Sequence, residues 1–216
     1  MKSPLTTLLS KQTPISIKAT RAVSNRQTIS YMQKIVLVIL VVNATFTLSA
    51  QTKKINVQKS IISWIGEKVT GKHSGTINLK EGTLLFKNKK IIGGNFTANM
   101  TTLSNTDQTG TGKQKLEGHL KSVDFFDTEN YKTSELVIKS ISEKQKDLYS
   151  ITADLTIKGI TKPVKFDLAV KKNTAVAKLI IDRTKYNIQY GSGSFFDDLG
   201  DRTIYDEFEL NVNLTF

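Results

Sequence analysis

The sequence predicts an all-β fold, an antiparallel barrel or sandwich, and three observations support that prediction. Apolar and polar residues alternate with a period of two along most of residues 51–216, as expected of strands with one buried face. Short turn-forming segments separate several of these runs. The strands do not alternate with helices, as they would in a parallel α/β sheet. We therefore expect about eight or nine antiparallel strands with mostly short connections.

The clearest strand covers residues 149–158, because every second residue from Tyr149 to Ile157 is apolar. Residues 162–172 and 207–216 show the same alternation. The other expected strands span residues 55–68, 73–79, 83–87, 91–103, 135–142 and 175–182.

Turns are expected where residues that favour tight connections separate neighbouring strands, at residues 80–82, 88–89 and 172–173. Gly93 and Gly94 lie inside an expected strand. Two glycines there indicate a bulge or a sharp bend, which helps a sheet to curl and close.

One segment, residues 104–131, loses the alternation and is expected to be an insertion between two strands. A short helix is predicted around residues 113–121. Residues 115–127 read KLEGHLKSVDFFD and contain a histidine, three carboxylates and two adjacent phenylalanines. We expect the apolar side chains to pack over or into one barrel end, and the carboxylates to stay in solvent or pair with lysines. The apolar residues are Leu116, Leu120, Val123, Phe125 and Phe126, and the acidic ones are Glu117, Asp124 and Asp127.

A second aromatic pair, Phe195 and Phe196, lies in a predicted loop, where large apolar side chains are less expected. We expect this pair to plug an end of the barrel. The alternative is that it forms part of a mouth through which an apolar ligand enters the barrel.

Residues 1–50 have the features of a leader and are kept apart from the barrel domain of residues 51–216. They carry six basic residues and no acidic ones, and an apolar run from Ile35 to Val42 precedes small and polar residues ending at Ala50. That order predicts a secretory signal peptide cleaved near Ala50, and the run is too short to span a bilayer. The mature protein is therefore expected to be periplasmic or secreted. Met32 stands where a short bacterial signal peptide would begin, which leads to the hypothesis that translation starts there.

Composition excludes several classes of function. The 216-residue chain has no cysteine, so it has no disulfide, no thiol nucleophile and no cysteine-ligated metal. The net charge is +12, but within residues 51–216 the basic residues are mixed with acidic ones rather than gathered in a stripe. Nucleic acid is therefore not an expected partner, whereas transient contact with anionic lipid headgroups is allowed.

No catalytic residue, metal or cofactor is predicted. His73 and His119 are the only histidines, and their spacing matches no metal motif. Ser122, His119 and Asp124 are close in sequence, but nucleophile activation needs a geometry that proximity does not supply. The acidic cluster of Asp197, Asp198 and Asp201 is expected to be solvated, or paired with the nearby Arg183, Lys185 and Arg202.

The inward positions of the expected strands are mostly large and apolar. A barrel of about eight strands either fills its interior with such side chains or holds one small or slender ligand. Periodicity does not distinguish a solid core from a cavity, but any ligand inside would be apolar.

A W-x-G-x-K-x-x-G-x-H-x-G pattern is carried by Trp64, Gly66, Lys68, Gly71, His73 and Gly75. Four more blocks follow it: KLEGHLKSVDFFD, ADLTIKGITKPVKFDL, IDRTKYNIQYGSGSFFDDLGD and IYDEFELNVNLTF. In this order, over residues 55–216, the five blocks resemble the YceI-like family of lipid- and polyisoprenoid-binding proteins. The resemblance implies an exported, lipocalin-like antiparallel β-barrel of about eight strands with one short helical insertion, and no catalytic residues.

The expected function is non-catalytic binding, storage or transport of a long-chain isoprenoid or similar amphiphilic lipid in an apolar cavity. The alternatives are an envelope hydrolase that uses carboxylates or His119, and a ligand-free barrel that binds a partner. A homodimer is also allowed. The candidate lipid-contacting residues are Trp64, Phe86, Phe96, Met100, Leu116, Leu120, Phe125, Phe126, Leu136, Ile138, Phe166, Leu168, Phe208 and Leu210.

Overall fold

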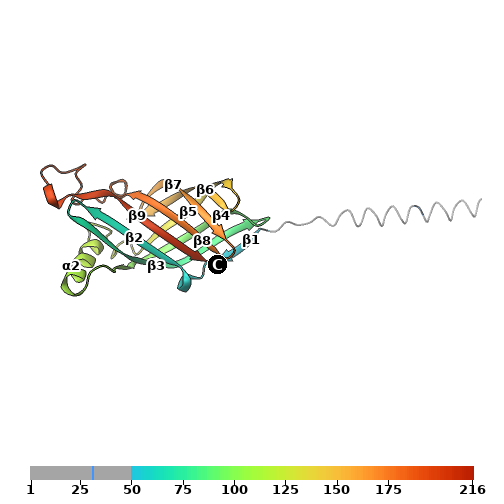
Figure 1. Ribbon diagram of the computed structural model, residues 1–216, viewed down its shortest axis with the longest axis horizontal. Coiled ribbons are helices and arrows are strands. Elements are labelled where there is room, and N and C mark those ends of the chain that lie inside the picture. The colour runs from blue at the N-terminus through green and yellow to red at the C-terminus, as the bar shows by residue number, and fades with distance from the viewer. Residues whose placement is uncertain (1–30, 32–49) are drawn as a thin grey trace, which may run out of the picture. The chain divides into compact units, whose positions relative to one another are not determined.

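The computed structural model describes residue 31 and residues 50–216, and it shows a closed antiparallel barrel of eight strands with one α-helix (Figure 1). The predicted fold class is therefore confirmed. The predictions of a signal peptide and of a start at Met32 concern residues that lie outside this description, apart from Ala50. Within the described residues, no helix combines the length and the hydropathy needed to cross a membrane.

The strands pair in the order of the sequence, and the last one closes the ring. Neighbours from β2 to β9 pair in succession, and β9 pairs with β2, where Trp64 lies opposite Leu210. The short β1 pairs with residues 83–86 in the C-terminal part of β3. The strands are β1 Gln51–Lys54, β2 Ile61–Lys68, β3 Gly71–Lys87, β4 Lys90–Asn105, β5 Thr133–Gln145, β6 Leu148–Ile157, β7 Ile160–Lys171, β8 Thr174–Asp182 and β9 Ile204–Thr215; α2 is Gly110–Lys121, and the 3₁₀ helices are η1 Val57–Lys59, η2 Arg183–Tyr186 and η3 Gly200–Arg202.

The turn predictions were right at two places and wrong at one. Asn88 and Lys89 both have positive φ and join β3 to β4, and Lys172 does the same between β7 and β8. Residues 80–82 form no turn, because β3 runs straight through them. The pairing register with β4 shifts between Leu79 and Glu81, so these residues form a bulge within β3 instead of a turn.

Two other predictions concern the start of β2 and the paired glycines. The strand expected from residue 55 begins only at Ile61, because residues 57–59 form η1, capped by the Asn56 side chain. Of the bulge or bend expected at Gly93 and Gly94, the structure shows a bulge, since the pairing register with β3 shifts beside Gly93. A side chain at Gly94 would lie 2.7 Å from the carbonyl oxygen of Thr83, so the close strand approach requires glycine.

The two ends of the barrel are built differently. α2 and the connection from β8 to β9 lie at one end, whereas β1 and the C-terminus lie at the other (Figure 1). At the C-terminal end, residues 55–60 close the barrel through backbone hydrogen bonds to Gly82 and Thr215. Leu84 and Ile151 are fully buried, and the rings of Phe86 and Phe216 pack 5.6 Å apart. We call this the closed end, and the end with α2 the helix end.

Candidate ligand cavity

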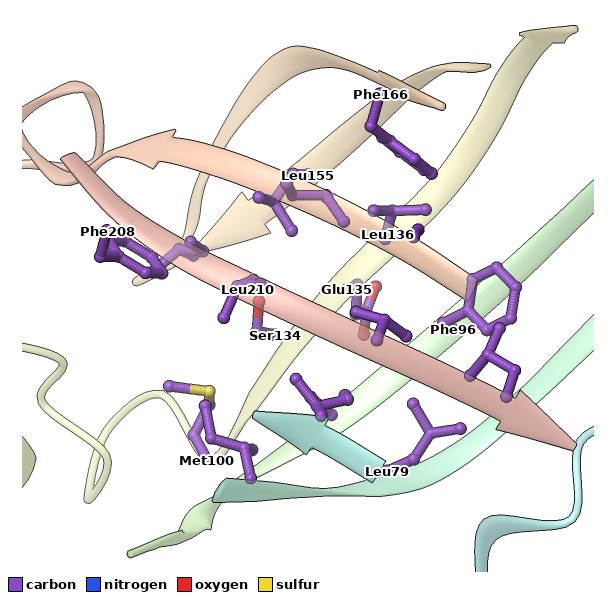
Figure 2. A pocket seen from close by; sticks show the side chains of 18 of the residues that line it. Leu79, Phe96, Met100, Ser134, Glu135, Leu136, Leu155, Phe166, Phe208 and Leu210 are labelled. Carbon is purple, nitrogen blue, oxygen red and sulfur yellow. The ribbon is translucent and has the colours of Figure 1, made fainter. Parts of the chain in front are cut away.

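An apolar cavity lies inside the barrel. Its volume is about 110 Å³, and its walls come from β2 to β9 together with Phe126. Figure 2 shows side chains of several strands converging on this space, with Met100 and Phe208 on one side and Phe96 and Phe166 on the other. We call it the inner cavity.

The strand pattern itself reveals the hollow. In β6, every second residue from Tyr149 to Ile157 is buried, as the alternation predicts. In β9, the inward residues Phe208 and Leu210 are only half-buried although they face the interior. An inward side chain that is only half-buried borders an unfilled part of the barrel interior, because close-packed neighbours would bury it completely.

A larger cavity of about 360 Å³ opens toward the helix end, and we call it the mouth cavity. Its wall includes Leu116, Leu120 and Phe125 from the inserted segment. Three residues line both cavities and therefore stand between them: Ile77, Phe126 and Phe208.

A chain of aromatic rings leads from the surface toward the interior. The His119 ring meets those of Tyr190 and Phe125 edge-on, with centroids 4.3 and 5.4 Å away. Phe125 is 5.7 Å from Phe126, which in turn meets Phe208 edge-on at 6.1 Å. Such pairs add stability beyond their buried area, so the mouth has an organised aromatic wall.

The apolar part of KLEGHLKSVDFFD behaves largely as predicted. Phe125 is buried and Phe126 reaches both cavities, so these two residues enter the barrel end. Leu116 and Leu120 line the mouth cavity from α2. Val123 was predicted wrongly, because it is 65% exposed. Val123 follows α2 in a turn, and this turn directs Phe125 and Phe126 inward while Val123 remains in solvent.

The carboxylates of the motif have three different environments. Asp124 is exposed, as predicted. Asp127 is buried and accepts hydrogen bonds from Asn130, so it is neither in solvent nor paired with a lysine. Glu117 pairs with Lys113 at 3.5 Å and also accepts hydrogen bonds from the Asn105 backbone N–H at 2.8 Å and from a hydroxyl. It therefore ties α2 to the end of β4.

Arg183 is a buried cation in the wall of the mouth cavity, and its exposed fraction is 2%. Its guanidinium donates to the backbone carbonyls of Ile188, Ile204 and Tyr205 at 2.8 to 3.1 Å. Asp206 lies 3.6 Å away, and the Phe125 ring centroid 5.5 Å away. Burial lowers the pKa of Arg183, and the neighbouring carboxylates oppose that shift. Arg183 thus fastens the connection between β8 and β9 to the start of β9.

The groups considered for catalysis are not assembled into a catalytic unit. His73 Nδ1 lies 2.8 Å from an Asp107 carboxylate oxygen, and the Ser74 backbone N–H donates to the same carboxylate. The Ser122 hydroxyl donates to the backbone carbonyl of His119, not to its imidazole. No group of three or more potential metal ligands occurs in the part of the chain that the structure describes.

The aromatic pair between β8 and β9 differs from the prediction, whereas the acidic cluster beside it is solvated, which is one of its two expected states. Phe195 and Phe196 are each 50% exposed, so the prediction that they plug the barrel was wrong. The short turn at Ser192, whose carbonyl accepts from both their backbone N–H groups, carries them outside the wall. Arg183 pairs with Asp206 and Lys185 with Asp182 instead of with the acidic cluster. The Arg202 guanidinium donates to the backbone carbonyls of Asp198 and Leu199 and not to a carboxylate. The cluster, Asp197, Asp198 and Asp201, is a solvated loop.

Most of the predicted cavity residues do line a cavity. The exceptions are Phe86 and Ile138, which face the interior but border neither cavity, because they pack in the core. That the others contact a lipid stays a prediction. The inner cavity is lined by Phe96, Met100, Phe126, Leu136, Phe166, Leu168, Phe208 and Leu210, and the mouth cavity by Trp64, Leu116, Leu120, Phe125, Phe126 and Phe208.

Several lining residues were missed. Ala98 and Ala177 line the inner cavity, and their inward positions follow from the same alternation that identified their larger neighbours. Small side chains at such positions indicate where a barrel is not filled. Arg183 and Tyr190 of the mouth cavity lie between strands, where periodicity carries no information.

Comparisons with known proteins agree with this architecture. The chain matches the YceI-like domain model over residues 46–216. A UPF0312 protein of Staphylococcus aureus (strain USA300) is 37% identical over 91 residues, which are 37% of this chain and 50% of that protein. Protein YceI of Escherichia coli O157:H7 is 34% identical over 90 residues, 42% of this chain and 44% of that protein. The chain thus spans about half the length of the curated relatives it matches.

Two solved structures share the fold. BcnA of Burkholderia cenocepacia aligns with a TM-score of 0.61 at 21% identity, covering 75% of this chain and 99% of that one. A polyisoprenoid binding domain from Saccharophagus degradans, implicated in plant cell wall breakdown, aligns with a TM-score of 0.50 at 12% identity, covering 77% and 97%. With its closed barrel, its helical insertion and a domain match over residues 46–216, this chain belongs to the YceI-like family.

Proposed function

We propose that the barrel binds, stores or carries one long-chain isoprenoid or similar amphiphilic lipid without covalent chemistry. The observation that carries the proposal is the apolar inner cavity, which shares Ile77, Phe126 and Phe208 with a mouth cavity of mixed polarity. The description of the Saccharophagus degradans domain as polyisoprenoid binding supports the choice of ligand.

Physical chemistry explains why such a ligand needs an enclosure. Each methylene of a lipid tail exposed to water costs about 0.8 kcal/mol, so a long isoprenoid crosses water only inside a protein. The inner cavity, at about 110 Å³, is below the range of roughly 300–1,000 Å³ that is usual for ligand sites. A long tail therefore enters by displacing side chains, and Phe126 and Phe208, which border both cavities, are the ones in its path.

The proposal includes no catalytic step. Among the described residues, no hydroxyl is hydrogen-bonded to the imidazole of either histidine. The inner cavity wall is apolar apart from Ser134 and Glu135, and such a wall suits solvation of a hydrocarbon tail.

The direct test is to purify the protein from its native host, extract it with organic solvent and analyse the extract by mass spectrometry. A long-chain lipid in stoichiometric amount is expected. Its absence, together with no binding of a fluorescent fatty acid such as cis-parinaric acid, would contradict the proposal.

A matched pair of variants tests whether the inner cavity is the site. Ala177 lines the inner cavity, whereas its neighbour Val176 on the same strand is 49% exposed on the outer face. Ala177→Phe should occupy the space and reduce cis-parinaric acid binding at least about tenfold, a loss of about 1.4 kcal/mol. Val176→Phe adds an aromatic ring to the same strand outside the barrel and should leave binding unchanged.

We further propose that the mature domain works in the periplasm or outside the cell and meets membranes transiently at the helix end. The exposed Phe195 and Phe196 support this orientation, since exposed aromatic side chains favour the membrane interface. Cell fractionation and N-terminal sequencing should find a mature chain beginning near Gln51. Co-sedimentation with phosphatidylcholine vesicles should weaken when both phenylalanines are changed to serine.

A further inference from the structure

The positive charge of the barrel domain is concentrated at its closed end. Four segments reach this end: residues 53–59, and the residues around three turns, 87–90, 143–147 and 171–173. Together they carry ten lysines and two carboxylates, a net charge of +8. The rest of residues 51–216 carries 15 basic and 17 acidic side chains, a net charge of −2. The fold therefore gathers at one end a charge that is dispersed along the sequence.

Contacts between these segments join them around the end of the barrel. The Phe216 backbone N–H donates to the Asn173 carbonyl at 2.8 Å, and Lys53 Nζ lies 4.9 Å from the Phe216 ring centroid. Lys90 forms an ion pair with Glu143, which links the turn after β3 to the end of β5. We call this ring of segments the basic rim. Its charged residues are Lys53, Lys54, Lys59, Lys87, Lys89, Lys90, Lys144, Lys146, Lys171 and Lys172, with Glu143 and Asp147.

Most cations of the basic rim have no fixed counter-charge. Lys90 pairs with Glu143, Lys144 pairs with Asp167 at 2.7 Å, and Lys53 lies over aromatic rings. The other seven lysines are exposed, and in the part of the chain that the structure describes they have neither an ion-pair nor a ring partner. The rim therefore presents seven uncompensated cations to solvent.

One turn of the rim carries a lysine where the backbone favours glycine. Asn88 and Lys89 form the two-residue connection from β3 to β4, with φ of 53° and 65°. Asn-Gly is the preferred pair for such a turn, because glycine has no Cβ to oppose the left-handed conformation. Lys89 is exposed and has no ion-pair partner within the described chain. It therefore adds charge to the rim at a conformational cost.

The composition of the rim indicates the kind of partner it fits. It has no arginine, the side chain suited to bidentate recognition of nucleic acid and enriched in the energetic centres of protein interfaces. Among the described residues, no exposed aromatic side chain lies in the rim segments, so the rim offers no ring for stacking bases or anchoring a protein. Lysines spread around a whole barrel end suit a surface of many anions, such as anionic phospholipid headgroups.

We propose that the basic rim docks the barrel, closed end first, on a bilayer surface rich in anionic phospholipid. This inference goes beyond the proposed ligand binding and does not depend on a bound lipid. The contact is electrostatic, whereas the contact proposed for Phe195 and Phe196 lies at the opposite end and is apolar. A barrel docked by its rim directs the mouth cavity away from that bilayer, where it is open to a second membrane.

Co-sedimentation with vesicles tests the docking. The protein should bind vesicles of equal parts phosphatidylglycerol and phosphatidylcholine at least about tenfold more tightly than vesicles of phosphatidylcholine alone. Raising NaCl from about 0.05 M to about 0.5 M should abolish most of that preference, because salt screens exposed charges. Changing Phe195 and Phe196 to serine should leave the preference for phosphatidylglycerol intact.

Two sets of variants with the same change in net charge locate the surface. Lys89→Asn, Lys146→Asn and Lys172→Asn together remove one exposed cation from each of three turns of the rim. They should weaken binding to the anionic vesicles about a hundredfold, since each lysine at an anionic membrane contributes about fivefold.

The control removes three exposed lysines outside the rim by Lys115→Gln, Lys132→Gln and Lys162→Gln. Binding should fall by about threefold or less, because these side chains lie away from the docked end.

The single variant Lys89→Gly separates docking from folding. Glycine suits the φ of 65°, so the urea midpoint of unfolding should stay the same or rise, while binding to anionic vesicles should weaken about fivefold.

Each contrary outcome overturns the docking. Equal binding to both kinds of vesicle would show that headgroup charge is not recognised. Equal losses in the rim and control sets would show that net charge alone attracts the protein to the bilayer. A single-stranded oligonucleotide that binds more tightly than the anionic vesicles, and is lost in the rim variants, would assign the surface to nucleic acid. None of these results bears on cis-parinaric acid binding, which tests the proposed function separately.

Discussion

The closed end and the helix end of the barrel follow the same alternating pattern but have different interiors. At the closed end, residues 55–60 form a cap and side chains such as Leu84 and Ile151 are fully buried. At the helix end, α2 buries none of its own residues, and the mouth cavity opens beside it. Strand register therefore sets which residues face inward, whereas the element that covers each end determines how closely those residues pack against one another.

We expect the two regions to differ most in the stability that is lost when a leucine is replaced by alanine, once at the closed end and once beside the inner cavity. Leu84→Ala at the closed end should lower the free energy of unfolding by about 3–5 kcal/mol, because it opens a cavity in a close-packed region. Leu210→Ala, in the wall of the inner cavity, should cost about 1–2 kcal/mol, because it enlarges a space that already exists. Urea unfolding followed by circular dichroism measures both. Equal losses would show that the middle of the barrel is as tightly packed as its closed end.

Arg183 is the structural anchor of the otherwise loosely filled helix end. Arg183→Met should lower the free energy of unfolding by about 2–4 kcal/mol, since three buried carbonyls lose their donor and Asp206 loses its partner. Arg183→Lys keeps the charge but not the planar fork, so it should recover only part of the loss. Lys185→Met, at a neighbouring side chain that is 64% exposed, is the control and should be nearly neutral. If the Arg183→Lys variant were as stable as the wild type, the planar guanidinium would not be needed to hold the three carbonyls.

The constriction between the cavities should control how fast a ligand enters. Phe126→Ala removes a ring that borders both cavities. It should speed cis-parinaric acid uptake in stopped-flow fluorescence about fivefold, a barrier lower by about 1 kcal/mol. Val123→Ala, at an exposed position three residues earlier, should leave the rate unchanged. An unchanged rate in the Phe126 variant would show that ligands enter by another path.

The smallest expected effect concerns the attachment of α2 at acid pH. The Asn105 backbone N–H hydrogen bond lowers the pKa of Glu117; partial burial opposes it, and the Ser104 hydroxyl and nearby lysines reinforce it. A lowered folded-state pKa means that this stabilisation is complete above the unfolded value of 4.5 and is lost as the pH falls below it. Glu117→Gln should cost about 1 kcal/mol or less at pH 7. Its unfolding free energy, measured from pH 7 to pH 3, should converge with that of the wild type, and a constant gap would contradict the assignment.

Sequence reasoning succeeded where a local pattern determines the outcome. The β6 alternation from Tyr149 to Ile157 corresponds directly to buried positions. The entry of Phe125 and Phe126 into the barrel end was also predicted, although the pattern of two adjacent phenylalanines does not by itself require burial. The turn expected at residues 80–82 failed, because a bulge and a turn share the same residue preferences and only cross-strand pairing distinguishes them.

The residues of the mouth cavity were harder to predict. Arg183 reaches carbonyls up to 22 residues away, and no local pattern encodes a contact of that range. Phe195 and Phe196 resemble Phe125 and Phe126 in sequence but remain exposed. The two pairs follow different backbone turns. One turn directs Phe125 and Phe126 inward, and the other directs Phe195 and Phe196 outward.

The amino-acid sequence alone predicted the fold class, the inward face of several strands and the family resemblance, and it excluded cysteine chemistry. The folded chain alone reveals that the closed end is packed, that cavities lie in the middle and at the helix end, and that Trp64 and Arg183 both line the mouth cavity. The physical reason is that a period of two specifies the side of a sheet on which a residue lies. It does not specify the distance across the closed barrel or the loop that covers its end, and both depend on contacts between residues far apart in the chain.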